Sequence, residues 1–357
     1  MSLTCAALFY WDWSAGDAIE TSNFTKSVAI AIFTCLQRPS NGLIWLILGG
    51  FLVINLLSTR KFKKVGYLFG KIGLIFIATV IFNCSIDYYF YGRLVFPIFR
   101  FLKFNFTTSL SNFYGVAPWH FHVLQSLPIT LGYSIPLFIY GLFTRLFTRK
   151  YPSAWLSPSI QVKVVVIANL LAYSALPHKE FRFIYPLQPF FVLVSSVSAI
   201  KLYGRFKVSD SRYKNGLWAF PFISLLAAYL LCTQHEKGAV SVMKSLHFQP
   251  RIDSIGFLMP CHSTPWQSYL HRNDIKKLWA ITCDPPLHLL DDPDAHNNLL
   301  HYMDESDYLY DEIPKFLQQN FPPIGEKGLN GTFRYDWPEY LVIFEHLDSP
   351  YMKSYLQ

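Results

Sequence analysis

The chain has 357 residues, of which 52% are hydrophobic and only 15% charged, and its formal net charge is +8. This composition excludes a disordered tail, a collagen-like fibre and a coiled coil. Residues 1–235 contain 21 Lys and Arg against 6 Asp and Glu, whereas residues 236–357 contain 10 against 17. We therefore expect two different domains, 1–235 and 236–357.

The first half contains six stretches without charged residues, each close to the length of a membrane span. A helix that crosses a bilayer needs about 20 mostly apolar residues, and shorter helices span when flanking side chains reach the interface. Six such stretches leave too little polar surface for a buried globular core. We expect about six spans, preceded by a helix remnant at 1–11 and a half-span at 27–36. The six expected spans are 41–59, 72–86, 123–144, 164–177, 183–200 and 216–235.

Lys and Arg are concentrated in alternate loops of this predicted bundle. Basic residues mark the cytosolic side of a membrane protein. The loops that follow the first, third and fifth spans should therefore be cytosolic, and the intervening loops and the acidic tail should lie on the opposite side. On this interpretation the positive charge is a topology signal, and it does not indicate a nucleic-acid partner.

The tail, 236–357, has the pattern of a small α/β unit. Short β-rich runs occupy 254–259, 278–282 and 340–344, and 304–320 has helical spacing with acidic residues at its start. Cys261 and Cys283 each follow a predicted strand, so they form either a disulfide in an oxidising lumen or two free thiols. No spacing of Cys and His suggests a metal site.

Two polar and aromatic clusters lie at the ends of predicted spans on the side opposite the basic loops. The segment 87–92 contains Asp87 and Tyr91, which would either line a sugar site or belong to an aromatic belt at the membrane interface. The segment 114–125 contains Trp119, His120 and Gln125, and Trp with His suits a carbohydrate or phosphate pocket as well as an interface.

The third cluster is the loop 177–183, Pro-His-Lys-Glu-Phe-Arg-Phe, between two apolar spans. Charges at the edge of the hydrocarbon are costly unless they are paired or functional. Arg offers a planar fork for phosphate oxygens and Lys a point charge, so this loop could meet a lipid phosphate. The alternative is structural, with Glu180 bridging Lys179 or Arg182 as their side chains extend to the interface.

Asn-x-Ser/Thr sequons predict glycosylation at Asn105 and Asn330, both on the side assigned to the lumen. A third sequon, at Asn83, lies too close to the predicted bilayer to be modified. These sites depend on the topology derived from the basic loops.

The segment His178-Lys-Glu-Phe-Arg-Phe183 resembles the His-Lys-Glu-x-Arg-Phe signature of glycosyltransferase family 22, the dolichol-phosphate-mannose-dependent mannosyltransferases of the endoplasmic reticulum. The segments 87–92, 104–105, 114–115, 118–120 and Gln125 are similar to the same family in the same order. In the tail, 257–268, 282–286 and 304–308 resemble the members that add the third mannose of the glycosylphosphatidylinositol (GPI) core.

This resemblance implies a mainly α membrane protein, a GT-C-type multi-span bundle with a small luminal α/β domain at its C-terminus. It implies α-1,2 transfer of mannose from dolichol-phosphate-mannose, the lipid-linked donor, to a GPI glycolipid acceptor, without a metal or other cofactor. In that scheme His178, Lys179 and Arg182 bind the donor phosphate and Glu180 orients them. Asp87, Tyr91, Trp119, His120 and Gln125 line the sugar site.

Family members carry an acidic motif of the His-Pro-Asp-Glu kind in a long first luminal loop, the expected source of the catalytic base. No such motif occurs in the 357 residues. We therefore expect the chain to be a fragment, the product of a misassigned start, or a non-catalytic relative, and we leave the base unassigned. The competing hypothesis is a polytopic membrane protein without chemistry, such as a lipid transporter or an assembly subunit.

Overall fold

The computed structural model describes residues 1–13, 16–108, 110–146, 157–205, 211–323, 333–347 and 352. It divides into two compact units, Met1–Ser224 and Leu225–Gln357, which we call the helical unit and the tail. The division falls inside a long helix, and the boundary predicted at 235/236 follows the end of that helix. Each unit is described by itself.

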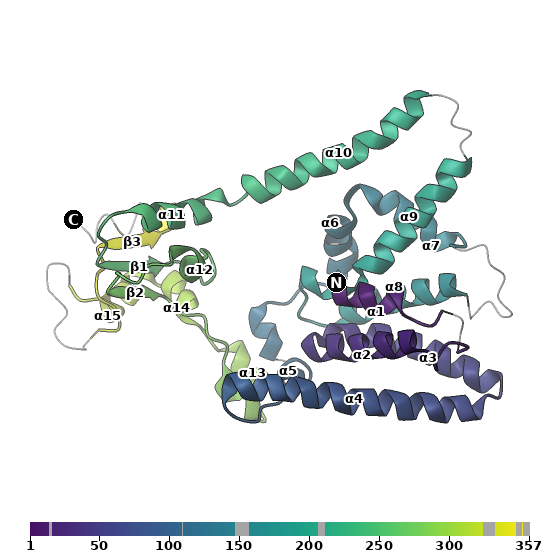
Figure 1. The fold of residues 1–357 in the computed structure, drawn as a ribbon. Coiled ribbons are helices and arrows are strands. Elements are labelled where there is room, and N and C mark those ends of the chain that lie inside the picture. Colours follow the sequence, from purple (N-terminus) through teal and green to yellow (C-terminus); the bar gives the residue numbers. More distant parts are fainter. Residues whose placement is uncertain are drawn as a thin grey trace. The chain divides into compact units, whose positions relative to one another are not determined.

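The described residues of the helical unit are mainly helical (Figure 1). Its short 3-10 and π-helical turns include Leu110–Tyr114, His122–Ser126 and Phe181–Leu187. The α-helices are α1 (Ser2–Phe9), α2 (Ser22–Gln37), α3 (Gly42–Ser58), α4 (Phe62–Tyr91), α5 (Pro97–Leu102), α6 (Leu127–Leu131), α7 (Ile135–Phe143), α8 (Pro158–Ala175), α9 (Gln188–Arg205) and α10 (Ser211–Thr233).

Among the described residues, five helical segments are long and apolar enough to cross a membrane, and they correspond to the first five predicted spans. They are Pro39–Ser58, Phe62–Tyr91, His122–Phe143, Pro158–Ala175 and Phe181–Gly204. The sixth predicted span lies in α10, where Pro221–Thr233 is a shorter apolar stretch. The predicted half-span at 27–36 is the last part of α2.

Helix α4 is much longer than the span predicted at 72–86 because Lys side chains do not end it. Lys71 donates from Nζ to the carbonyl oxygen of Ile19 at 2.9 Å, so its charge lies at the start of α2 while its backbone remains helical. Long basic side chains reach away from apolar surface in this way. The uncharged stretch 72–86 therefore covers only the middle of α4.

The core of the helical unit lies between α3, α7, α8 and α9. Phe138 of α7 packs edge-to-face on Phe191 of α9, with ring centroids 5.4 Å apart, and both side chains are fully buried. Gly141 of α7 faces Val194 and Ser198, and a Cβ at this position would clash with both. A small residue thus lets two helix backbones approach closely, as in other membrane bundles.

Large apolar side chains remain exposed on the outer faces of these helices. Leu46 is 73% exposed and Leu74 is 71% exposed. Such faces are what a lipid-facing helix presents, because hydrocarbon replaces water as its solvent. The fold class predicted from the sequence is confirmed: a mainly helical, multi-span protein with a small α/β tail. The luminal position of the tail stays a prediction.

The tail surrounds a three-stranded parallel sheet in the order β2-β1-β3. Gly256 of β1 pairs with Trp279 of β2 and with Leu341 of β3. All three predicted strands are confirmed. The elements are α11 (Lys237–Phe248), β1 (Ser254–Leu258), α12 (Trp266–Leu270), β2 (Lys277–Ala280), α13 (Ala295–Leu300), α14 (Glu305–Asp311), α15 (Ile313–Asn320), β3 (Tyr340–Ile343) and α16 (Glu345–Leu347).

The helix predicted at 304–320 is two helices in the structure. Asp304 caps α14 by accepting from the backbone N–H of Asp307 at 2.8 Å, as its acidic start predicted. Pro314 lies in the first turn of α15, where its missing N–H needs no partner. The proline therefore starts a second helix at a point where the apolar spacing alone suggested continuity.

Candidate functional site

The loop between α8 and the 3-10 turn Phe181–Leu187 carries the charged cluster singled out in the sequence. His178 is buried, and both of its ring nitrogens face acceptors: Nδ1 lies 2.7 Å from the carbonyl oxygen of Gly115, and Nε2 lies 3.0 Å from Glu180 Oε1. A histidine ring donates from both nitrogens only as an imidazolium. The geometry therefore fits a charged ring held between a backbone dipole and a carboxylate.

Lys179 is also buried, with 8% of its surface exposed. Its ammonium donates to the carbonyl oxygens of Ala117 at 2.7 Å, of Leu176, and of Pro177 at 3.5 Å. The carbonyls near the end of α8 lack helical partners and carry partial negative charge. Burial lowers the pKa of Lys179, and these three oxygens are the acceptors that a protonated amine needs.

Glu180 and Arg182 form a two-point ion pair. Arg182 Nη2 donates to Glu180 Oε1 at 2.7 Å, and Arg182 Nε contacts Oε2. Burial raises the pKa of Glu180, but hydrogen bonds from Arg182 and His178 outweigh it, so the pKa lies below its usual 4.5. The Arg182 side chain is 60% exposed, so its guanidinium is fixed at one side and open at the other.

The segment 115–117 fastens this loop to the rest of the helical unit. Besides the carbonyls of Gly115 and Ala117, the Ala117 N–H donates to the carbonyl oxygen of Pro177 at 3.1 Å. Gly115 has φ +96°, a conformation that favours glycine. Sequence reasoning did not find these contacts, because a backbone carbonyl has no sequence signature; the only signal was a glycine after Tyr114.

Aromatic rings enclose His178. Its ring centroid lies 6.0 Å from that of Tyr114 and 5.6 Å from that of Phe183. Phe181, in turn, lies 5.0 Å from Phe121, next to the predicted sugar-site segment. These rings limit the access of water to the hydrogen bonds of the loop.

Three of the predicted sugar-site residues lie within the eight positions after the 115–117 segment. Trp119 is 71% exposed and its ring lies 5.6 Å from that of His120, which is half-buried, while Gln125 is exposed in the turn His122–Ser126. Their backbone is therefore tied to the His178 loop through Ala117. Their assignment to a sugar site stays a prediction.

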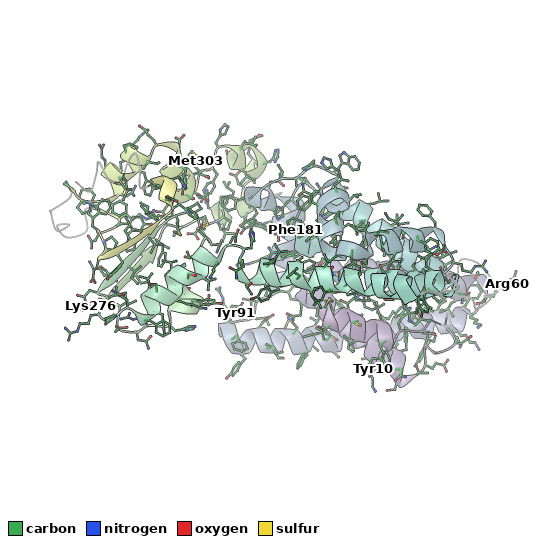
Figure 2. All side chains as sticks on the ribbon, turned by 90° about the horizontal axis from the view of Figure 1, so that it is seen from above. Tyr10, Arg60, Tyr91, Phe181, Lys276 and Met303 are labelled. Atoms are coloured by element: carbon green, nitrogen blue, oxygen red, sulfur yellow. A yellow bond between two sulfur atoms is a disulfide. The ribbon has the colours of Figure 1, made fainter. Side chains whose placement is uncertain are left out.

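Asp87 and Tyr91 lie at the far end of α4. Asp87 accepts from Asn83 Nδ2 at 3.0 Å, and Asn83 accepts from Gln37 Nε2 at 2.7 Å, so Asp87 is tied to α2. Figure 2 places Tyr91 and Phe181 toward the same end of the helical unit, away from Arg60. Among the described residues no hydrogen bond or ion pair is recorded between these two residues and the charged loop, so they share only this end of the helical unit.

The remaining predicted sites fall in other parts of the molecule. Asn105 lies in a π-helical turn, Lys103–Thr107, and donates to the carbonyl oxygen of Phe101 at 2.8 Å. Asn330 lies outside the described residues. Cys261 and Cys283 form a disulfide in the tail. Within the described ranges no group of three or more His, Cys, Asp or Glu side chains is placed to hold a metal ion.

The chemistry of the charged loop is that of an anion site with a rigid support. The carboxylate of Glu180 holds the Arg182 guanidinium, and the His178 ring in turn contacts Glu180. Backbone carbonyls hold the His178 ring and the Lys179 ammonium. An oriented Arg fork matches phosphate or carboxylate oxygens. The loop can therefore present a fixed positive group at the end of two membrane-length helices.

Residues 1–271 match the profile of the Alg9-like mannosyltransferase family. Proteins called GPI mannosyltransferase 3 are similar to the whole chain: that of Saccharomyces cerevisiae is 53% identical, that of Kluyveromyces lactis 52% and that of Candida glabrata 52%. The matches cover 100% of this chain but 58%, 61% and 59% of those proteins, so the chain spans about three-fifths of their length. No solved structure matches the chain significantly.

Proposed function

This chain belongs to the Alg9-like mannosyltransferase family, and on that premise we propose that it takes part in transferring the third, α-1,2-linked mannose of a GPI precursor. The donor is dolichol-phosphate-mannose, the acceptor is a GPI glycolipid that carries two mannoses, and the reaction takes place in the membrane of the endoplasmic reticulum with the charged loop and the tail on the luminal side. The similarity to GPI mannosyltransferase 3 proteins along the whole chain supports this acceptor.

The observation that carries the proposal is the half-open guanidinium of Arg182. Glu180 occupies its Nε and Nη2 groups, and the rest of the fork is left for an outside oxygen. When mannose leaves dolichol phosphate, negative charge develops on the phosphate oxygens. A cation fixed in advance stabilises that charge without reorganising during the reaction.

The other residues of the loop act on Arg182. Glu180 fixes the plane of the guanidinium, and His178 fixes Glu180. Lys179 holds the loop against 115–117 through carbonyls. Of the three residues predicted to bind phosphate, Arg182 keeps that role in this proposal, whereas His178 and Lys179 become positioning residues because their polar atoms are already engaged.

The mannosyl group would then lie on the side of Trp119 and His120. These residues follow the segment that anchors the charged loop, and Trp119 exposes a ring face on which a sugar can stack. One in-line displacement fits the inversion from donor to product. The proposal assigns no catalytic base within the chain.

The test replaces Arg182 in the gene of the source organism, so that the protein is studied at its natural length. Labelled GPI precursors are then extracted and separated by their number of mannoses. We expect Arg182→Gln to reduce the third transfer by about 100-fold and precursors with two mannoses to accumulate. Arg182→Lys should retain part of the activity, because a point charge replaces the fork.

Arg100→Gln is the matched control, because Arg100 is a basic residue of α5 outside the charged loop. It should leave the precursor pattern unchanged. A normal pattern in Arg182→Gln cells, or accumulation of precursors with one or three mannoses, would refute the proposal.

A further inference from the structure

A second pair of cations lies at the end of the helical unit opposite the charged loop. Lys163 belongs to the first part of α8, and Lys201 belongs to the last part of α9. The charged loop joins the other ends of these two helices, so about 20 Å of helix separates Lys201 from it. On the topology predicted from the basic loops, this end faces the cytosol. The proposed transfer reaction does not use it.

The chain just after α7 accepts hydrogen bonds from both ammonium groups. Lys163 Nζ donates to the carbonyl oxygen of Thr144 at 2.7 Å, and Lys201 Nζ donates to the carbonyl oxygen of Arg145. The backbone N–H of the next residue donates to Ser159 Oγ of α8 at 2.9 Å. The segment 144–146 is therefore fastened to both α8 and α9.

Close packing of α7 on α9 brings these two cations together. The backbones of the two helices approach closely at Gly141, which faces Ser198 of α9. Lys201 follows Ser198 by about one helical turn, so its side chain begins near the end of α7. The ammonium groups of Lys163 and Lys201 are close enough to repel each other. Their positions therefore create a concentrated positive charge where three helices meet.

Neither ammonium group is fully occupied by its carbonyl. An ammonium has three N–H donors, and the described residues supply one acceptor to Lys163 and one to Lys201. The only acidic residue between positions 145 and 204 is Glu180, in the charged loop at the other end. Lys179 differs, because three carbonyls accept from it. The two half-buried lysines therefore keep donors for an outside anion.

Exposed apolar side chains flank the two cations. Phe143, just before Thr144, is 85% exposed, and Ile200, just before Lys201, is 72% exposed. In a bilayer such side chains face hydrocarbon, whereas the long stem of a lysine carries its ammonium to the level of the headgroups. A ligand that fits both features joins an anionic group to apolar chains.

We propose that Lys163 and Lys201 bind the phosphate of an anionic phospholipid in the cytosolic leaflet, with its acyl chains along Phe143 and Ile200. The phosphate offsets the repulsion between the two ammonium groups and thereby holds the ends of α7, α8 and α9 together. Anionic lipids give the cytosolic leaflet its negative surface, and basic pockets between membrane helices on that side bind their headgroups. This binding does not depend on mannosyl transfer, which the charged loop serves at the other end.

The test uses the protein at its natural length, purified in a non-ionic detergent and stripped of lipid. Native mass spectrometry and thermal unfolding compare four additions: phosphatidylinositol, phosphatidylserine, phosphatidylcholine and water-soluble glycerophosphoinositol. We expect both anionic lipids to raise the Tm and to bind about 10-fold more tightly than phosphatidylcholine. Glycerophosphoinositol should bind about 10-fold more weakly than phosphatidylinositol, because it lacks acyl chains. Added salt should weaken the binding of both anionic lipids.

Variants separate the two lysines from the general positive charge of this end. Lys163→Gln with Lys201→Gln removes both charges but keeps amide donors for the carbonyls, and it should abolish the preference for anionic lipids. The double Arg variant keeps both charges and should keep the preference. Lys63→Gln is the matched control, because Lys63 is an exposed lysine in the first turn of α4, at the same end. It should leave the preference unchanged.

Four results would overturn the proposal: equal affinity for phosphatidylcholine and phosphatidylinositol, equal affinity for glycerophosphoinositol, an unchanged preference in the double Gln variant, or loss of the preference in the double Arg variant. An equal loss in Lys63→Gln would also overturn it, since the preference would then come from bulk charge. Arg182→Gln should bind the lipid normally, so a failure here is distinct from a failure of the transfer proposal.

Discussion

Each unit contains a largely buried charged side chain, Lys179 in one and Glu305 in the other, and the two are compensated differently. Lys179 in the helical unit donates to carbonyls of Ala117, Leu176 and Pro177, so its partners are backbone dipoles. Glu305 in the tail accepts from Thr282 and Tyr335 and pairs with Arg334, so its partners are mainly side chains.

The difference follows from what each architecture offers. A helix that ends leaves carbonyls without partners, and a cation placed just beyond its C-terminus satisfies them. Parallel strands satisfy most of their own backbone groups, so a buried carboxylate at their edge needs donors from elsewhere in the chain. The end of α8 therefore supplies the acceptors Leu176 and Pro177 close in sequence to Lys179, and Ala117 adds a third from a distant segment. At the sheet edge, side chains from elsewhere in the chain supply most of the donors.

Of the substitutions that test this difference between the units, Lys179→Met is expected to lower stability most. The apolar chain fits a buried position but leaves the carbonyls of Ala117 and Leu176 without the ammonium donor, which costs about 4 kcal/mol of unfolding free energy. Hydrogen exchange should rise in 111–125 and 176–187 and stay unchanged in the tail. Lys244→Met, at an exposed position on α11, is the control. Unchanged exchange around 176–187 would show that backbone dipoles do not hold the loop.

The next effect is expected in the tail. Replacing Cys261 and Cys283 together by Ser removes a link between residues separated by 22 positions. A loop of this length contributes about 3 kcal/mol by restricting the unfolded chain. Thermal unfolding and exchange of 254–284 should report the loss, with the helical unit unaffected. Cys232→Ser, at an exposed free thiol, should change neither. An equal loss in both units would mean that they unfold together.

A smaller effect is expected from Gly115→Ala. The space around Gly115 is open, so the cost of about 1 kcal/mol comes from its φ of +96° alone. Relaxation to negative φ would also move the carbonyl that His178 contacts. The matched control is Gly66→Ala in α4, where the same change should slightly stabilise a helix. Stabilisation by both substitutions would contradict the assigned turn.

The smallest effects are pH dependences of opposite sign. The pKa of Glu180 is lowered on folding, so its contribution is complete above pH 4.5 and is lost as the pH falls through the folded value. Because Arg182 is 60% exposed, the contribution is below about 1 kcal/mol. The dependence of unfolding free energy on pH between pH 3 and 6 should become weaker in Glu180→Gln. Retention of the slope in that variant would assign it to another group.

The tail should show its dependence at alkaline pH instead. Burial and the hydrogen bond to Glu305 raise the pKa of Tyr335 above 10, so the unfolded chain loses this proton first and stability falls as the pH rises beyond 10. Tyr335→Phe should remove that slope. If Glu180→Gln and Tyr335→Phe both changed stability only at acidic pH, or both only at alkaline pH, the proposed difference between the two units would be contradicted.

Much of the fold could be predicted from the sequence, because apolar length and alternation are local properties. Five spans and three strands lie where they were expected. The ends of elements were less accurate: α4 continues past Lys71, whose side chain reaches α2, and 304–320 is divided at Pro314. The sequence alone does not show that Lys71 can lie inside a helix, because its ammonium is satisfied by a carbonyl in a distant segment.

The sequence by itself determined that charged residues gather at one loop between two apolar spans, that Arg182 is among them, and that an acidic α/β tail follows. The tertiary structure decided which of these groups remain open. Lys179 and Arg182 have similar signatures as cations, yet one is enclosed by carbonyls and the other is exposed. The physical reason is that backbone acceptors are the same at every position, so only the path of the chain decides which side chain reaches them.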